Sequence, residues 1–93
     1  MNRADPAGQL LRVLRRSAAA AGCAVELRHH ASTPWASATY TGGRHRVAVA
    51  GDAAEWLATL AEADLPLVGH FVASCAVERD TTGWWLTILV LEE

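Results

Sequence analysis

Residues 35–52 read WASATYTGGRHRVAVAGD, and this stretch decides the predicted fold. Two segments that alternate between apolar and polar residues, Trp35–Thr41 and Arg44–Ala50, flank the pair Gly42-Gly43. Alternation with a period of two is typical of a half-buried strand. Because two consecutive glycines tolerate the positive φ of a tight turn, the pattern predicts a β-hairpin at this point.

A strand and a helix are predicted before this hairpin. Residues Val25–His30 also alternate, and Ser32-Thr33-Pro34 is expected to end that strand. Further upstream, leucines and alanines recur at helical spacing over Pro6–Ala21, with arginines on the opposite side. Gly22 follows, a residue that readily closes a helix in the left-handed conformation. The first half of the chain therefore predicts one helix and three strands.

A second helix and a second hairpin are predicted after it. Gly51-Asp52 ends the third strand and begins a helix that Pro66 stops. The segments Val68–Arg79 and Trp84–Leu91 then form a hairpin around a polar turn. The sequence thus predicts one α+β domain over residues 1–93, in the order αβββαββ, with a five-stranded antiparallel sheet and both helices packed on one face.

This order of elements is similar to that of the small dimeric chaperones of type III secretion, which bind an unfolded segment of an effector protein. The similarity concerns only the order of elements and includes no sequence motif, and the last helix of that family is missing here. The resemblance implies a dimeric module that binds protein.

Charge is distributed unevenly along the chain. All eight basic residues are Arg, the acidic residues number ten, and the formal net charge is −2. The first half is basic and the second half acidic, which we interpret as two halves that face each other in one fold. The net charge does not predict a nucleic-acid partner. A binder of anionic partners, including nucleic acid, remains an alternative that would use Arg12, Arg15, Arg16, Arg28, Arg44 and Arg46.

Cysteine content and hydropathy indicate a cytoplasmic protein without a cofactor. Cys23 and Cys75 are the only cysteines and form no CxxC pair, so neither a disulfide scaffold nor a zinc ribbon is predicted. The stretch Arg15–Cys23 imitates an export signal, but its apolar part is short and mostly Ala. No stretch approaches the ~20 apolar residues that span a bilayer, so no membrane association is expected.

The final hairpin carries the main functional prediction, because both of its faces are apolar. Strands of this kind are normally covered on both faces, yet two helices cover only one side of a five-stranded sheet. We therefore expect the second face to meet another copy of the chain or, failing that, another protein. The predicted homodimer interface consists of Val72, Ser74, Ala76, Trp85, Thr87, Leu89 and Leu91.

The titratable residues offer a second interpretation, a small-ligand site or a minor enzyme. Folding the chain about Gly42-Gly43 would pair Tyr40 with His45, with His29 on the same face. A phenol and an imidazole on an apolar face could orient a small ligand. The spacing of the histidines predicts no metal site, and no catalytic residue is assigned. The sequence therefore favours an interaction or regulatory module without catalytic activity.

Overall fold

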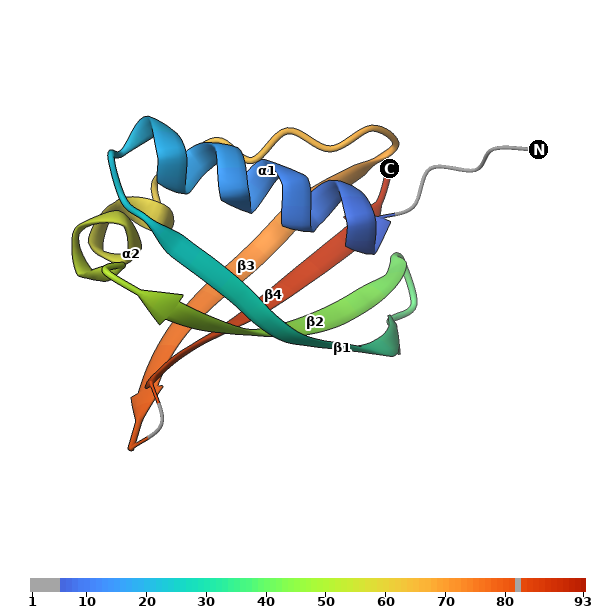
Figure 1. Cartoon of the computed structure of the whole chain (residues 1–93). Helices are drawn as coiled ribbons and strands as arrows, with labels where there is room; N and C mark the ends of the chain where they lie inside the picture. The colour runs from blue at the N-terminus through green and yellow to red at the C-terminus, as the bar shows by residue number, and fades with distance from the viewer. Residues whose placement is uncertain (1–5, 82) are drawn as a thin grey trace.

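The structure is a computed structural model that describes residues 6–81 and 83–93. The chain enters the fold as a helix, runs through a long hairpin and a short second helix, and ends in a second long hairpin (Figure 1). In chain order the elements are α1 (Pro6–Ala20), β1 (Val25–Ala36), β2 (Thr41–Gly51), α2 (Ala54–Leu60), β3 (His70–Asp80) and β4 (Gly83–Glu92).

The predicted α+β class is confirmed, with an antiparallel sheet and both helices against one of its faces. The strands lie in the order β1-β2-β4-β3, so β2 and β4 are central and β1 and β3 are the edges. Each hairpin thus contributes one inner and one edge strand. The helices and the sheet enclose the core between them.

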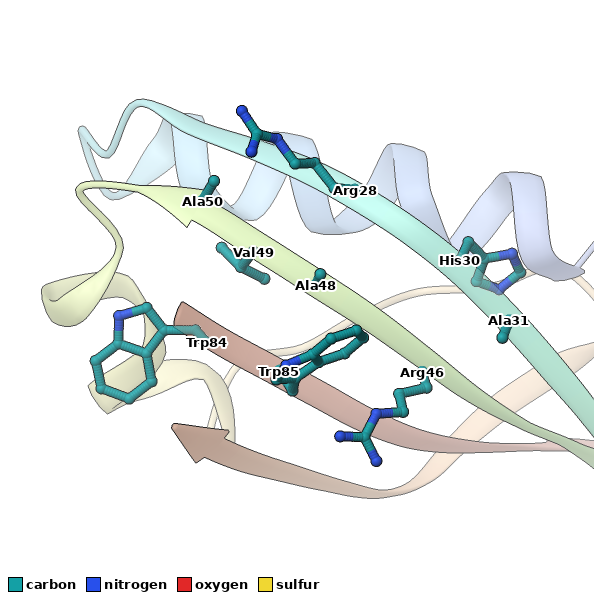
Figure 2. A pocket seen from close by; sticks show the side chains of 9 residues that line it. All are labelled: Arg28, His30, Ala31, Arg46, Ala48, Val49, Ala50, Trp84 and Trp85. Atoms are coloured by element: carbon teal, nitrogen blue, oxygen red, sulfur yellow. The ribbon is translucent and has the colours of Figure 1, made fainter. Parts of the chain in front are cut away.

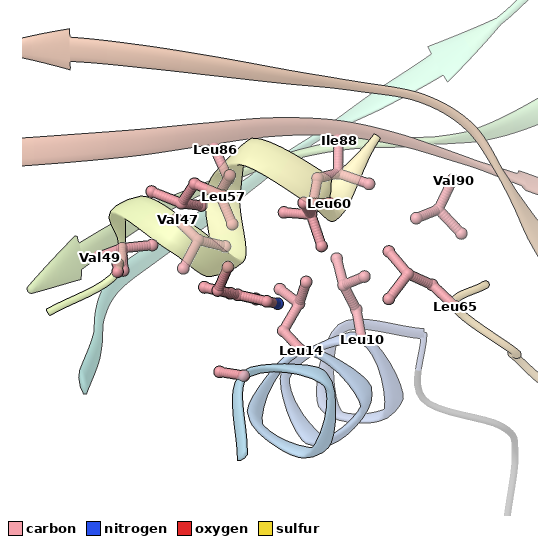
Figure 3. Close-up of a cluster of buried hydrophobic side chains, with 13 residues drawn as sticks. Leu10, Leu14, Val47, Val49, Leu57, Leu60, Leu65, Leu86, Ile88 and Val90 are labelled. Atoms are coloured by element: carbon pink, nitrogen blue, oxygen red, sulfur yellow. The ribbon is translucent and has the colours of Figure 1, made fainter. Parts of the chain in front are cut away.

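Leucines of α1, residues of α2 and alternate residues of β2 and β4 form this core (Figure 3). Trp56 is its largest side chain, is 1% exposed, and donates its indole Nε1–H to Ser17 Oγ at 2.9 Å. That hydrogen bond satisfies a polar group which burial would otherwise penalise. The other fully buried large side chains are Leu10, Leu14, Leu60, Leu86, Ile88, Val47 and Val90.

Residues 25–36 form one strand, β1, where the sequence predicted two strands separated by Ser32-Thr33-Pro34. The sheet of the described residues therefore has four strands and the order of elements is α-β-β-α-β-β. Pro34 lies within β1, which is an edge strand, the position in a sheet where proline is tolerated.

The turn of the first hairpin lies at residues 37–40 and not at Gly42-Gly43, which belong to β2. Ser37 stabilises it, because its Oγ accepts hydrogen bonds from the backbone N–H groups of Thr39 and Tyr40. Neither glycine has a positive φ. Gly42 is required for another reason: a Cβ at this position would lie 2.0 Å from the carbonyl oxygen of Val90.

Two bulges shift which side chains face the helices. The register of β1 against β2 changes between Arg28 and His30, and that of β3 against β4 changes between Val72 and Ser74. An extra residue reverses the alternation beyond it, because side chains in a strand alternate with a period of two. Strict alternation, used in the sequence prediction, therefore assigns the wrong face to residues on one side of each bulge.

Candidate protein-interaction surface

The face of the sheet opposite the helices is called the outer face here. Directly paired residues on neighbouring strands lie on the same face, so the register gives the outer face four rows that cross all four strands, with the pair Glu26 and Ala50 beyond the first row. In the strand order β1, β2, β4, β3, the first row is Arg28, Ala48, Trp85, Glu78; the second Ala31, Arg46, Thr87, Ala76; the third Thr33, Arg44, Leu89, Ser74; and the fourth Trp35, Gly42, Leu91, Phe71.

Most of the predicted interface lies together on this face, where the register places Ser74, Ala76, Trp85, Thr87, Leu89 and Leu91. Val72 is the exception. It pairs with Val90 and packs against the core, because the bulge at Ala73 turns it toward the helices. The same bulge brings Phe71 to the outer face, where the sequence prediction did not place it.

The fourth row is partly covered by the chain itself. Tyr40, in the turn between β1 and β2, reaches across β4 and contacts Phe71 edge to face, with ring centroids 5.8 Å apart. Thr41 Oγ1 donates to Glu92 Oε2 at 2.9 Å and holds the same turn against the end of β4. Leu91 is consequently only 6% exposed.

The other three rows keep apolar side chains at the surface. Trp85 and Leu89 are only half-buried, and both point away from the helices. Trp85 is held in place by polar neighbours: its indole Nε1–H donates to Asp80 Oδ2 at 2.9 Å, and the guanidinium carbon of Arg46 lies 4.6 Å from the ring centroid. An indole fixed in this way is pre-organised for contact, since little conformational freedom remains to be lost on binding.

A groove of about 640 Å³ runs beside Trp85 across the first two rows (Figure 2). The small side chains Ala48 and Ala50 of β2 lie between Arg28 of β1 and Trp85 of β4. The groove exists because β2 has alanines where β4 has tryptophan. Its volume is in the range of sites that accept one large aromatic group or a small molecule.

The six arginines proposed for an anionic partner do not form one surface. Arg28, Arg44 and Arg46 are exposed on the outer face. The other three, Arg12, Arg15 and Arg16, are exposed on α1, which lies on the opposite face of the sheet. Within the first set, Arg28 Nε donates to Glu26 Oε1 at 2.8 Å, and this hydrogen bond lowers the pKa of the Glu26 carboxyl below its ordinary value.

The predicted ligand-binding residues are not brought together either. Tyr40 is 44% exposed and lies against Phe71, whereas His45 is 4% exposed and faces the helices. The pairing of Tyr40 with His45 depended on a turn at Gly42-Gly43, and the observed turn removes it. The side chain of His29 lies outside the described residues.

His45 instead hydrogen-bonds His30. Nε2 of His30 and Nδ1 of His45 are 3.0 Å apart, the ring planes differ by 10°, and the centroids are 5.2 Å apart. Because the ring planes are nearly parallel and the two nitrogens are closer together than the two centroids, both nitrogens lie between the rings. The rings therefore contact each other through these nitrogens. One ring donates an N–H and the other accepts it. The bulge at residue 29 creates this pair, and no sequence signal marks a bulge there.

Metal-ligating groups and thiols are the remaining candidates for chemistry among the described residues. No group of three or more His, Cys, Asp or Glu among them is arranged to hold a metal ion. Cys23 and Cys75 are free, and burial raises the pKa of the Cys75 thiol, which disfavours the nucleophilic thiolate.

Comparisons with family models, with curated proteins and with solved structures found no match. Within residues 6–81 and 83–93, no helix is both long enough and apolar enough to cross a membrane.

Proposed function

We propose that this chain is a non-catalytic interaction domain that forms a homodimer through the outer face of its sheet. The observation that carries the proposal is that β4 is apolar on both sides while the helices cover one of them. Leu86 and Ile88 are fully buried beneath the helices, and Trp85 and Leu89 are left half-buried on the outer face. A second layer over such a strand would bury that apolar surface.

The outer face is large enough for this purpose. Four strands spaced ~4.8 Å apart make it about 19 Å wide, and β2 and β4 pair from Gly42 to Val49, eight residues or about 27 Å at ~3.4 Å each. A pair of such faces offers roughly 1,000 Å² in total, which is about the lower bound for a specific protein–protein interface. Two-fold homodimers are the commonest assemblies of soluble proteins, which favours a second copy as the partner.

Sedimentation velocity at micromolar concentration tests the proposal. Wild type is expected to sediment as a dimer, and Leu89→Arg as a monomer with unchanged circular dichroism, because the new charge is placed in the middle of the contact. Ala19→Arg adds the same charge to the exposed side of α1 and should leave the dimer intact. A monomeric wild type contradicts the proposed function, and so does a Leu89→Arg variant that remains dimeric.

A further inference from the structure

The proposed homodimer does not specify the relative orientation of the two copies. The size and charge of the residues in each row of the outer face indicate one orientation. We propose that two copies pack outer face to outer face about a two-fold axis that runs parallel to the strands, between β2 and β4, so that Trp85 of each copy fills the groove of the other. This inference rests on the proposed function and adds to it the geometry of the contact and the residues that specify it.

Such an axis places every row against the same row of the partner. It brings β2 of one copy opposite the partner's β4, and β1 opposite the partner's β3, because the strand order is β1-β2-β4-β3. The mean strand directions of the two sheets are then parallel, which belongs to the aligned class of face-to-face sheet packing.

The first row is complementary to itself in both size and charge under this operation. Ala48, on the floor of the groove, is opposite the partner's Trp85, so the largest side chain of the face meets the smallest. Arg28 is opposite the partner's Glu78, and both side chains are exposed at the sheet edges. Each of these contacts occurs twice, since the interface is symmetric.

The second and third rows are compatible with the same arrangement. Ala31 is opposite the partner's Ala76, and Thr33 is opposite the partner's Ser74, so small side chains meet at both edges. The central arginines of β2, Arg46 and Arg44, are opposite Thr87 and Leu89 of the partner subunit. The aliphatic stem of Arg44 can cover the partner's Leu89, while the Arg46 guanidinium stays over the Trp85 ring of its own chain.

The other two-fold axis in the plane of the sheet, perpendicular to the strands, fits less well. It would place the first row against the partner's fourth row, so that Ala48 would face a glycine and the groove would stay empty. Glu78 would face the partner's Phe71, a carboxylate against an aromatic ring with no cation opposite it. The four rows therefore favour the axis parallel to the strands, which also brings Glu26, itself paired with Arg28, opposite the partner's Asp80.

The pair Arg28 and Glu78 allows the contact between copies to be tested separately from contacts within one chain. They lie on opposite edges of the sheet, three strand spacings or about 14 Å apart, and cannot pair within one copy. Any energetic coupling between them must act between copies. Glu26→Gln is the matched control, because it removes the partner of Arg28 within the chain and leaves the proposed contact unchanged.

The experiment uses Arg28→Glu and Glu78→Arg, alone and as an equimolar mixture, in sedimentation equilibrium. Each variant alone brings like charges together twice and is expected to weaken the homodimer about ten-fold. In the mixed dimer both pairs are again opposite in charge, so the mixture should recover to within about three-fold of wild type. Glu26→Gln should match wild type.

The outcomes separate the two proposals. If wild type is a dimer but the mixture associates no better than the separate variants, or if neither variant is weakened, this geometry is wrong and the proposed function stands. If wild type is a monomer, both are wrong. A second, independent check is the fluorescence of Trp85, which should shift to shorter wavelength on association in a variant where the other three tryptophans are replaced by phenylalanine.

Discussion

Gly42→Ala is the substitution that most directly tests the observed path of β2. A Cβ at position 42 would lie 2.0 Å from the carbonyl oxygen of Val90 and 2.8 Å from the Cα of Leu91, both backbone atoms of β4. Contacts shorter than 3.0 Å are essentially never seen for Cβ atoms, so the two strands must separate by about 1 Å locally. The neighbouring Gly43 is the control, since its Cβ would come closest to the tip of the His45 ring, at 3.2 Å, and would lie at an ordinary van der Waals distance of 3.6 Å from the carbonyl oxygen of Thr33.

The expected cost follows from the strand pairing that is lost. A separation of this size stretches about two ladder hydrogen bonds beyond their working length at roughly 1 kcal/mol each, and residual overpacking adds a further kcal/mol or so. Gly42→Ala should therefore lower the free energy of unfolding by about 3 kcal/mol, a large part of the ~5–14 kcal/mol expected for a chain of this length. Gly43→Ala should cost no more than about 1 kcal/mol, because the imidazole can move and the unfolded chain loses entropy.

Urea denaturation followed by tryptophan fluorescence measures both variants, at one fixed protein concentration because association contributes to the apparent stability. A two-residue turn at Gly42-Gly43, as the sequence alone suggested, would need positive φ at both positions and so predicts similar costs. The observed register predicts a difference of about 2 kcal/mol. Costs that agree within about 0.5 kcal/mol would refute the reasoning.

Three further predictions concern the core, the bulge in β3 and the buried thiol. Ser17→Ala should cost about 1–2 kcal/mol in urea denaturation, because it leaves the buried indole N–H of Trp56 without its acceptor; a cost under 0.5 kcal/mol contradicts this. Val72→Asp should destabilise the fold by more than about 2 kcal/mol, whereas Ser74→Asp should be mild, since only the former points into the core; equal effects would argue against the bulge. In a chain with its other cysteine replaced by serine, Cys75 should react with iodoacetamide more slowly than in urea at pH 8. Because its folded pKa is raised, native stability should fall as pH rises above the ordinary thiol pKa, and a Cys75→Ala variant should lack that fall.

Elements that obey a regular period were predictable from the sequence. The helical spacing of Leu10, Leu14 and Ala18 predicted α1 and its buried side, and all three are core residues. The period-two pattern of β4 likewise predicted which side chains face the helices, with Leu86 and Ile88 buried. These patterns repeat over ten or more residues, so a single local irregularity does not obscure them.

The candidate site was less predictable because it depends on single-residue irregularities. One extra residue at position 29 turns His30 toward the helices and beside His45, where strict alternation from Leu27 would place it on the outer face, and one at position 73 exchanges Val72 for Phe71 on the outer face. A bulge shifts the alternation of apolar and polar residues by a single position, and so small a shift in the sequence pattern does not reveal the bulge. The turn was misplaced for a similar reason, since glycines required by a close backbone contact look the same in sequence as glycines required by a turn.

The two central strands give the outer face the asymmetry on which its proposed pairing depends. The β2 strand contributes Gly42 and Ala48 to this face, while β4 contributes Leu91 and Trp85 at the paired positions. One central strand has small residues and the other has large residues, so the face is uneven. It is nevertheless complementary to a second copy rotated about a two-fold axis between those strands. A flat face with Leu or Val on both strands would bury similar area without preferring any one orientation. Specificity of association would therefore reside in the contrast between β2 and β4, which is why exchanging residues at positions 48 and 85 should disturb orientation as well as affinity.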